Sequence, residues 1–144
     1  MTPDVNVLVA ASRSDHPHHK AARDWLRLAI AEAGGGRTLL LLPMVVASYL
    51  RLVTHRKIFV SPTPIDAALS FVDALLDLPG VSMPAIGDEW PRLREICLSK
   101  GLSANAIPDA WLAAAVREMG DHLVTFDADF KRLLSRGEYT LLDT

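Results

Sequence analysis

The sequence predicts an α/β fold: a three-layer α/β/α domain with a central parallel sheet. Short apolar runs alternate with amphipathic helical segments along the chain, and glycine or proline stands at most of the junctions. This alternation is typical of parallel strands joined by crossover helices, which pack on the faces of the sheet. Apolar residues make up 50% of the 144 residues, enough for a buried core, and the length predicts a single domain over residues 1–144.

Five short apolar runs are the predicted strands, at residues 1–5, 39–42, 81–83, 121–126 and 139–142. The second run consists of four leucines; it is too short for a helix and apolar on both faces, as in a strand buried inside a parallel sheet. Ligands of such folds gather beyond the carboxyl ends of the strands. We therefore expect the functional residues at these ends.

Seven helices are predicted between these runs, at residues 5–12, 18–33, 43–55, 64–78, 88–100, 108–119 and 127–134. Pro43 and Pro64 stand at helix starts, where the missing N–H has no helical partner in any case. The glycines at 34–36 and Gly101 follow helix ends, where positive φ is common. Trp111 shares one helical face with apolar neighbours and is predicted to be part of the core.

Charge and cysteine content narrow the class of protein. The formal net charge of −2 excludes a strongly basic nucleic-acid coat protein but allows an enzyme with one local basic patch. Cys97 is the only cysteine, which excludes an intramolecular disulfide and a Cys-based zinc site. The uncharged run at 39–50 is shorter than the roughly 18 residues of a membrane span, and Asp4 stands where a signal peptide carries positive charge. We expect a cytoplasmic protein without a membrane segment.

Four acidic residues fall at predicted strand ends or helix starts. Asp4 ends the first strand, Asp127 ends the fourth with Asp129 close behind, and Asp109 opens the helix after Pro108. At one rim of a parallel sheet, their mutual repulsion would raise the carboxyl pKa values unless a cation neutralised them. An all-oxygen cluster of this kind suits Mg²⁺ or Mn²⁺. Taken singly, Asp127 and Asp109 are equally well explained as acids that stabilise a helix N-terminus.

At these residues the chain resembles the PIN-domain ribonucleases, in particular the VapC toxins of bacterial toxin–antitoxin pairs. The matching stretches, in the family's order and spacing, are PDVNVLVAA (3–11), LPMVVASYLRLVTHRKIF (42–59), IPDAWLAAAVREMG (107–120) and LVTFDADF (123–130). The resemblance implies an endoribonuclease that hydrolyses RNA phosphodiesters with Mg²⁺, or Mn²⁺ in its place. It also implies a VapB-type antitoxin partner and a homodimer, for which the apolar helices at 18–33 and 44–55 either supply the surface or face the core.

The resemblance also assigns the site residues. Asp4 matches the family's first metal ligand, while Asp109 and Asp127 match the acids on the later helix and after the last long strand. The supporting positions that it implies are Asp129, Asn6 and Thr125. The implied reaction is attack of a metal-activated water on the phosphorus.

The chain departs from the family pattern on the predicted helix at 43–55. The family usually has a glutamate there, whereas this sequence has Ser48 and no Glu between Glu32 and Glu89. Arg51 follows Ser48 on the same helical face, so it either acts on the acids or the scissile phosphate or is a solvated surface charge. The missing acid motivates a second hypothesis: a PIN-like module that has lost catalysis and only binds RNA or a protein.

Two further groups of residues have weaker signals. The histidines in HPHH (16–19) lack acid or cysteine partners at metal-site spacing and are predicted to form a polar helix entry. Basic residues cluster at 51–57 and at 131–136, where they either follow an RNA backbone or form solvated faces.

Overall fold

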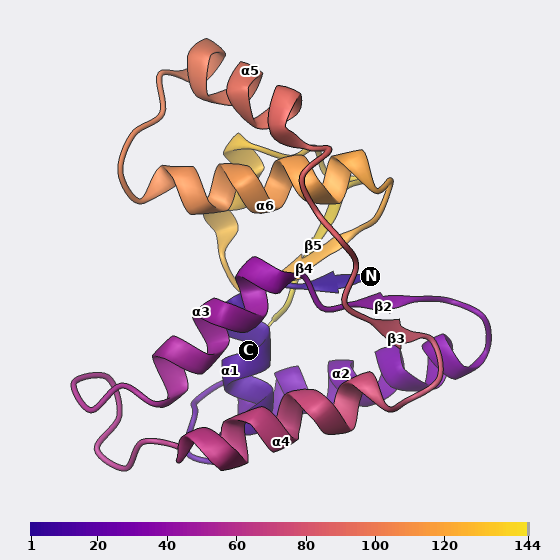
Figure 1. Cartoon of the computed structure of the whole chain (residues 1–144), viewed down its shortest axis with the longest axis vertical. Helices are drawn as coiled ribbons and strands as arrows, with labels where there is room; N and C mark the ends of the chain where they lie inside the picture. The colour runs from indigo at the N-terminus through magenta and orange to yellow at the C-terminus, as the bar shows by residue number, and fades with distance from the viewer. Residues whose placement is uncertain (144) are drawn as a thin grey trace.

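Five short parallel strands form the middle layer of the computed structural model, which describes residues 1–143 (Figure 1). They are β1 (Thr2–Pro3), β2 (Leu39–Leu40), β3 (Val81–Ser82), β4 (Leu123–Thr125) and β5 (Tyr139–Leu141). One sheet has the order β1-β4-β5, β2 pairs with β3, and every pairing is parallel. The backbone N–H of Leu40 donates to the carbonyl of Met1 at 2.9 Å, which joins the two groups in the order β3-β2-β1-β4-β5.

Helices cover both faces of these strands. Within residues 1–143 they are α1 (Val5–Ser12), α2 (His19–Gly34), α3 (Pro43–Val53), α4 (Ile65–Leu76), α5 (Trp90–Lys100), α6 (Ala106–Glu118) and the 3₁₀-helix η1 (Ala128–Arg132). Figure 1 shows α5 and α6 on one side of the strands and α1 to α4 on the other, which confirms the predicted α/β/α layers. No helix among the described residues is long and apolar enough to cross a membrane.

The structure corrects several predicted boundaries. The leucine run is a strand only over β2, because Leu42 already caps α3. Helix α6 begins at Ala106, earlier than predicted, so Asp109 lies inside its first turn. The segment predicted as a helix at 127–134 is the shorter 3₁₀-helix η1. Trp111 was predicted to be a core residue but is 40% exposed, although Leu112 and Ala115, which share the predicted apolar face, are buried.

Much of the apolar stripe of α2 and of α3 faces the core, although Leu28 on α2 is exposed, so their part in a homodimer stays a prediction. Leu26 on α2 and Tyr49 on α3 are 7% and 0% exposed. On α6 the buried face is built largely from alanines, at 110 and 113–115, all at most 1% exposed. Side chains this small let the backbone of α6 lie deep in the molecule.

Strands β1 and β4 lie side by side where the strand order reverses. The chain leaves β1 toward β2 and later returns to β4 on the other side of β1. In open parallel sheets, the crevice outside the carboxyl ends of such strands is the usual ligand site. Asp4 follows β1 and Asp127 follows β4 shortly after its end, so the fold brings two of the predicted site residues to this crevice.

Candidate active site

Asp4 joins the end of β1 to the start of α1. Its Oδ1 accepts a hydrogen bond from the backbone N–H of Val5 at 2.7 Å, which caps the helix. Its Oδ2 accepts from Thr125 Oγ1 at 2.6 Å and from Asn6 Nδ2 at 3.2 Å. Burial raises the pKa of Asp4, and the nearby charge of Asp127 adds to the rise, while the hydrogen bonds oppose it. The carboxylate is thus 5% exposed and held in one orientation.

Asn6 and Thr125 tie the two strand ends together. The Asn6 side chain donates to Thr125 Oγ1 at 3.3 Å and accepts from the backbone N–H of Phe126 at 3.2 Å. Thr125 Oγ1 in turn accepts from the backbone N–H of Asp127 at 3.0 Å. Asn6 and Thr125, two of the residues predicted to support the site, therefore contact its acids or the backbone that carries them.

Asp127 also acts as a helix cap, as its position in the sequence allowed. Its Oδ1 accepts from the backbone N–H of Asp129 at 2.8 Å, at the start of η1. This interaction sets Asp127 and Asp129 at one end of β4. Capping and a role in the site are therefore compatible for this residue, because only one carboxylate oxygen accepts that bond.

Asp109 faces the other acids from α6. Burial raises its pKa to about 6, and the charges of Asp4, Asp127 and Asp129 add to the rise. None of the ion pairs formed within residues 1–143 involves any of these four acids. The structure therefore gathers negative charge from three parts of the chain without a basic side chain paired to it.

The carboxylate oxygens of these four acids are suitable ligands for a hard divalent cation, although the side chains lie too far apart to enclose one. In the described part of the chain, no three His, Cys, Asp or Glu side chains come close enough together to hold one ion directly. Mg²⁺ is usually held by one or two carboxylates and keeps several waters, so it does not need a closed cage of protein ligands. The unpaired negative charge around Asp109 is what a cation would neutralise.

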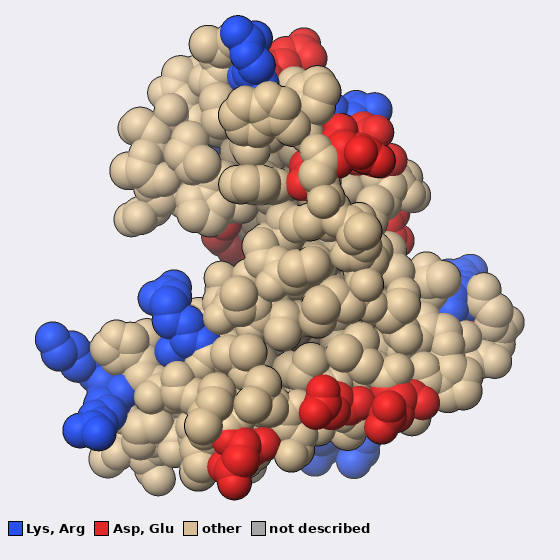
Figure 2. All heavy atoms as spheres, viewed as in Figure 1, with Lys and Arg blue, Asp and Glu red and all other residues tan. Residues whose placement is uncertain are grey.

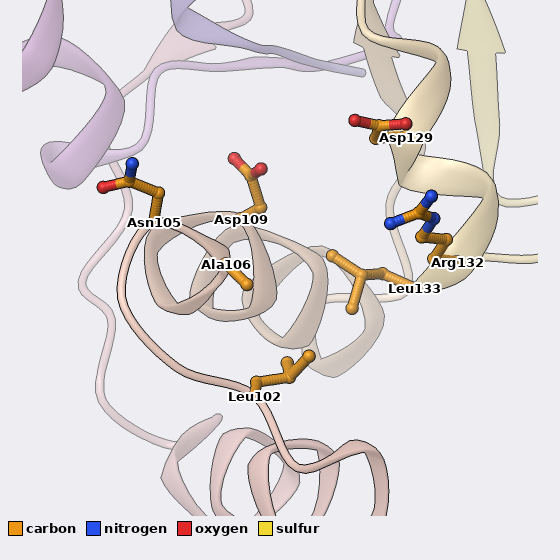
Figure 3. Close-up of a pocket in the computed structure, with 7 residues that line it drawn as sticks. All are labelled: Leu102, Asn105, Ala106, Asp109, Asp129, Arg132 and Leu133. Atoms are coloured by element: carbon orange, nitrogen blue, oxygen red, sulfur yellow. The ribbon is translucent and has the colours of Figure 1, made fainter.

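Two hollows flank Asp109, and it lines both. Figure 3 shows the more polar of the two, called the polar hollow below: Asp129 and Arg132 on η1 lie across from Asp109 on α6, with Asn105, the N-cap of α6, on the other side of Asp109. Leu102, Ala106 and Leu133 complete its lining. The second is more apolar and lies between α1, α3 and α6. Its lining includes Asp4, Ser48 and Trp111 together with apolar side chains. Figure 2 shows a notch in the surface between the part formed by α5 and α6 and the part formed by α3. Acidic atoms lie recessed in this notch, and basic atoms lie along its lower edge.

Ser48 and Arg51 differ in their placement. Ser48 lines the apolar hollow together with Asp4 and Asp109, as expected for the position that carries glutamate in the resemblance. Arg51 lies one turn further along α3, is exposed, and forms no ion pair within residues 1–143. Its contact with substrate stays a prediction.

The histidine-rich helix entry has a packing role. The ring of His18 stacks on Phe126, with centroids 4.9 Å apart, and His19 Nδ1 lies 2.8 Å from the carbonyl oxygen of Ala10. These contacts fasten the start of α2 to α1 and to the end of β4.

Sequence reasoning missed one pair of residues beside the acids. Trp111 was placed in the core, and Glu89 was not singled out. In the structure the Trp111 indole N–H donates to Glu89 Oε1 at 2.6 Å, at the edge of the apolar hollow. The two residues are 22 positions apart on different helices, so no local spacing indicates the contact.

Comparison with known proteins agrees with the fold. The PIN domain family matches residues 1–134. Ribonuclease VapC25 of Mycobacterium tuberculosis is 39% identical over 137 residues, with 92% of each chain covered. Ribonuclease VapC31 of the same species is 40% identical over 139 residues, again with 92% of each chain covered.

Solved structures show the same fold at lower identity. VapBC2 from Rickettsia felis, crystallised with a DNA fragment from its promoter, aligns with a TM-score of 0.68 at 20% identity, covering 99% of this chain and 98% of that one. VapC20 of Mycobacterium tuberculosis, described as a toxin that cleaves the sarcin-ricin loop, aligns with a TM-score of 0.61 at 18% identity, covering 91% and 92%. The chain belongs to the PIN-domain family. Within that family its curated relatives are the VapC ribonucleases.

Proposed function

We propose that the protein is a metal-dependent endoribonuclease and the toxin of a toxin–antitoxin pair. The observation that carries the proposal is the group of acids around Asp109, which converge from separate elements without a basic partner among the described residues. Relatives at 39% and 40% identity bear the name ribonuclease, which supports the same reaction for this chain. The substrate in this proposal is RNA.

Asp4, Asp109 and Asp127 are the proposed metal-holding and catalytic residues, with Asp129 in support. The mixture of buried and exposed carboxylates suits Mg²⁺, with Mn²⁺ as a substitute. A bound ion of this kind lowers the pKa of a bound water and balances the charge of a phosphodiester.

The remaining site residues orient the acids and the substrate. Asn6 and Thr125 donate to one oxygen of Asp4, which leaves the carboxylate little freedom to rotate. Arg132, at the polar hollow, is placed to pair with a phosphate oxygen, and Arg51 at the exposed edge of α3 is a second candidate. Ser48 offers a hydroxyl that can donate or accept.

The proposed partners follow from the relatives. Structures of similar fold include VapBC2 from Rickettsia felis and VapBC-5 from Mycobacterium tuberculosis, described as a member of a toxin–antitoxin family. We infer a VapB-type antitoxin as the cognate partner of this chain, a homodimer as its assembly and the cytoplasm as its location.

A cleavage time course on defined structured RNAs tests the proposal. Antitoxin-free protein with Mg²⁺ or Mn²⁺ should give discrete products that disappear with EDTA and in Asp4→Asn. Asparagine caps a helix as well as aspartate does, so this variant should stay folded while it loses the charge. Asp66→Asn, which changes an exposed acid in the first turn of α4, is the matched control and should keep the activity.

The second hypothesis, a module that only binds, rests on Ser48 in place of the expected glutamate. It predicts that RNA is retained without metal-dependent products. Metal-dependent cleavage that appears only in Ser48→Glu would favour it over the nuclease proposal, whereas cleavage by the unaltered chain would exclude it.

A further inference from the structure

A buried carboxylate holds the ring of Trp111 in place beside the acids. Glu89 Oε1 accepts from the Trp111 indole N–H at 2.6 Å, and its Oε2 accepts from the backbone N–H of Gly87 at 2.7 Å. Burial acts to raise the pKa of Glu89, but these hydrogen bonds hold it below its ordinary value. Glu89 is 2% exposed while Trp111 is 40% exposed, so a buried charge fixes the orientation of a surface ring.

The Trp111 ring is part of the wall of the apolar hollow. This hollow has a volume of about 350 Å³, and Asp4 and Asp109 line it directly. Apart from those two acids, its polar lining includes the neutral side chain of Ser48. The rest of its lining is mostly apolar, from Val5, Met44, Val45, Ile107, Pro108 and Leu112, so a flat, neutral group can cover this wall without burying an unpaired charge.

The two hollows beside Asp109 match the two parts of a nucleotide. The polar hollow has Arg132 and Asn105, which can donate to phosphate and ribose oxygens, beside the carboxylates of Asp109 and Asp129, which the proposed cation would neutralise. The apolar hollow has an aromatic ring, and bases of single-stranded RNA stack on aromatic side chains. A phosphodiester at Asp109 therefore has hydrogen-bond donors in the hollow on one side and an aromatic ring in the hollow on the other.

We propose that the apolar hollow is a nucleobase site, in which the base next to the scissile phosphodiester stacks on Trp111. The inference rests on the proposed ribonuclease function and adds a specificity site to it. Trp111 is the substrate-binding residue, Glu89 is a positioning residue that acts through it, and Ser48 supplies a hydroxyl within the same hollow. A glutamate at position 48 would bring a third carboxylate and a longer side chain into this space, so serine keeps the hollow open for a base.

Binding of short RNAs to the Asp4→Asn protein tests the nucleobase site without any chemistry. The probes are fluorescent hexaribonucleotides of A, C, G or U, followed by versions of the tightest one with a single abasic position moved along it. Trp111→Leu should weaken binding by about 5- to 150-fold, the range for loss of one base–aromatic stack. In the parent protein, removal of one particular base should weaken binding by a similar factor. In Trp111→Leu, removal of the same base should not weaken binding further, because the stacking partner is already absent.

Two more variants separate positioning from general damage. Trp90→Leu removes another exposed tryptophan, one that does not line the hollow, and should leave RNA affinity unchanged. The amide of Glu89→Gln can still accept a hydrogen bond from the Trp111 indole, but it has only one oxygen and so cannot also accept from the backbone N–H of Gly87 at its second terminal atom. Glu89→Gln should therefore weaken RNA binding less than Trp111→Leu. The affinity that Glu89→Gln loses should come from the same base, so the abasic probe that lacks this base should bind Glu89→Gln and the parent equally well.

Three results would overturn the nucleobase site. The first is that no hexamer binds, or that Trp111→Leu binds all hexamers as the parent does. The second is that Trp111→Leu weakens every abasic probe equally, which indicates a structural role. The third is that Trp111→Leu keeps its affinity for RNA but no longer binds the purified antitoxin. That result would assign the hollow to a protein partner. Because these assays measure binding and not cleavage, absence of RNA products from the unaltered protein is a separate result that concerns only the ribonuclease proposal.

Discussion

Asp109 should destabilise the metal-free protein when it is charged, so Asp109→Asn should stabilise it. Burial and the charges of Asp4, Asp127 and Asp129 raise its pKa from 3.8 to about 6. A difference of roughly two pKa units corresponds to about 3 kcal/mol against the folded state at pH 8. In the first turn of α6 the charge also gains about 0.3–1 kcal/mol from the helix dipole, which asparagine loses. The expected net stabilisation is about 2 kcal/mol.

The pH dependence has a definite sign. Because the folded-state pKa lies above the unfolded value of 3.8, the penalty is absent below that pH, develops between pH 3.8 and about 6, and is complete above it. The advantage of Asp109→Asn should therefore fall to about a third of its full value at pH 4.5.

Urea denaturation in EDTA at pH 8 and pH 4.5 measures this difference. Asp66→Asn, an exposed acid in the first turn of α4, is the control and should change stability by no more than about 1 kcal/mol. Added Mg²⁺ should stabilise the unaltered protein more than Asp109→Asn, because a ligand stabilises the state that binds it. The electrostatic account fails if Asp109→Asn is no more stable than the parent at pH 8, or if the gap is the same at both pH values.

Two further changes test the packing around the site. Thr125→Val removes a fully buried hydroxyl that donates to Asp4, so urea denaturation should show a loss of about 1–3 kcal/mol, and an unchanged midpoint would contradict that role. Gly80→Ala should lower the melting temperature far more than Gly101→Ala. Both glycines have positive φ, but a Cβ on Gly80 would overlap the carbonyl of Ala33, whereas a Cβ on Gly101 meets no atom within 4 Å. Equal losses would show that backbone conformation alone sets the cost.

Strand ends and helix ends were predictable because their signals are local. Asp4 directly follows an apolar run, and Gly101 ends α5 with φ of 59°, as a glycine after a helical segment should. The apolar residues of α1 are buried almost without interruption, so that helix has no amphipathic period, and the sequence indicated its helical form only weakly. The parallel sheet itself followed from the alternation of strands and helices.

Features that depend on distant residues were not predictable. The exposure of Trp111 depends on where α5 lies against α6, which helical periodicity does not encode. Asp109 does not open the helix as predicted, because α6 already begins at Ala106. Helical spacing placed Arg51 on the face of Ser48, but only Ser48 lines the apolar hollow, because the lining depends on where α3 packs against α1 and α6.

The hydrogen bond between Thr125 and Asp4 links residues 121 positions apart. Strand β1 finds its partner β4 only when residues 123–125 are available, so the site cannot assemble on a growing chain until most of it has been synthesised. Contacts this distant in sequence also form slowly during folding, because a long loop must close first. For a protein proposed to cut RNA, this order of events delays activity until synthesis of the chain is nearly complete, so a prematurely terminated copy that lacks β4 carries no assembled site to act on the cell that made it.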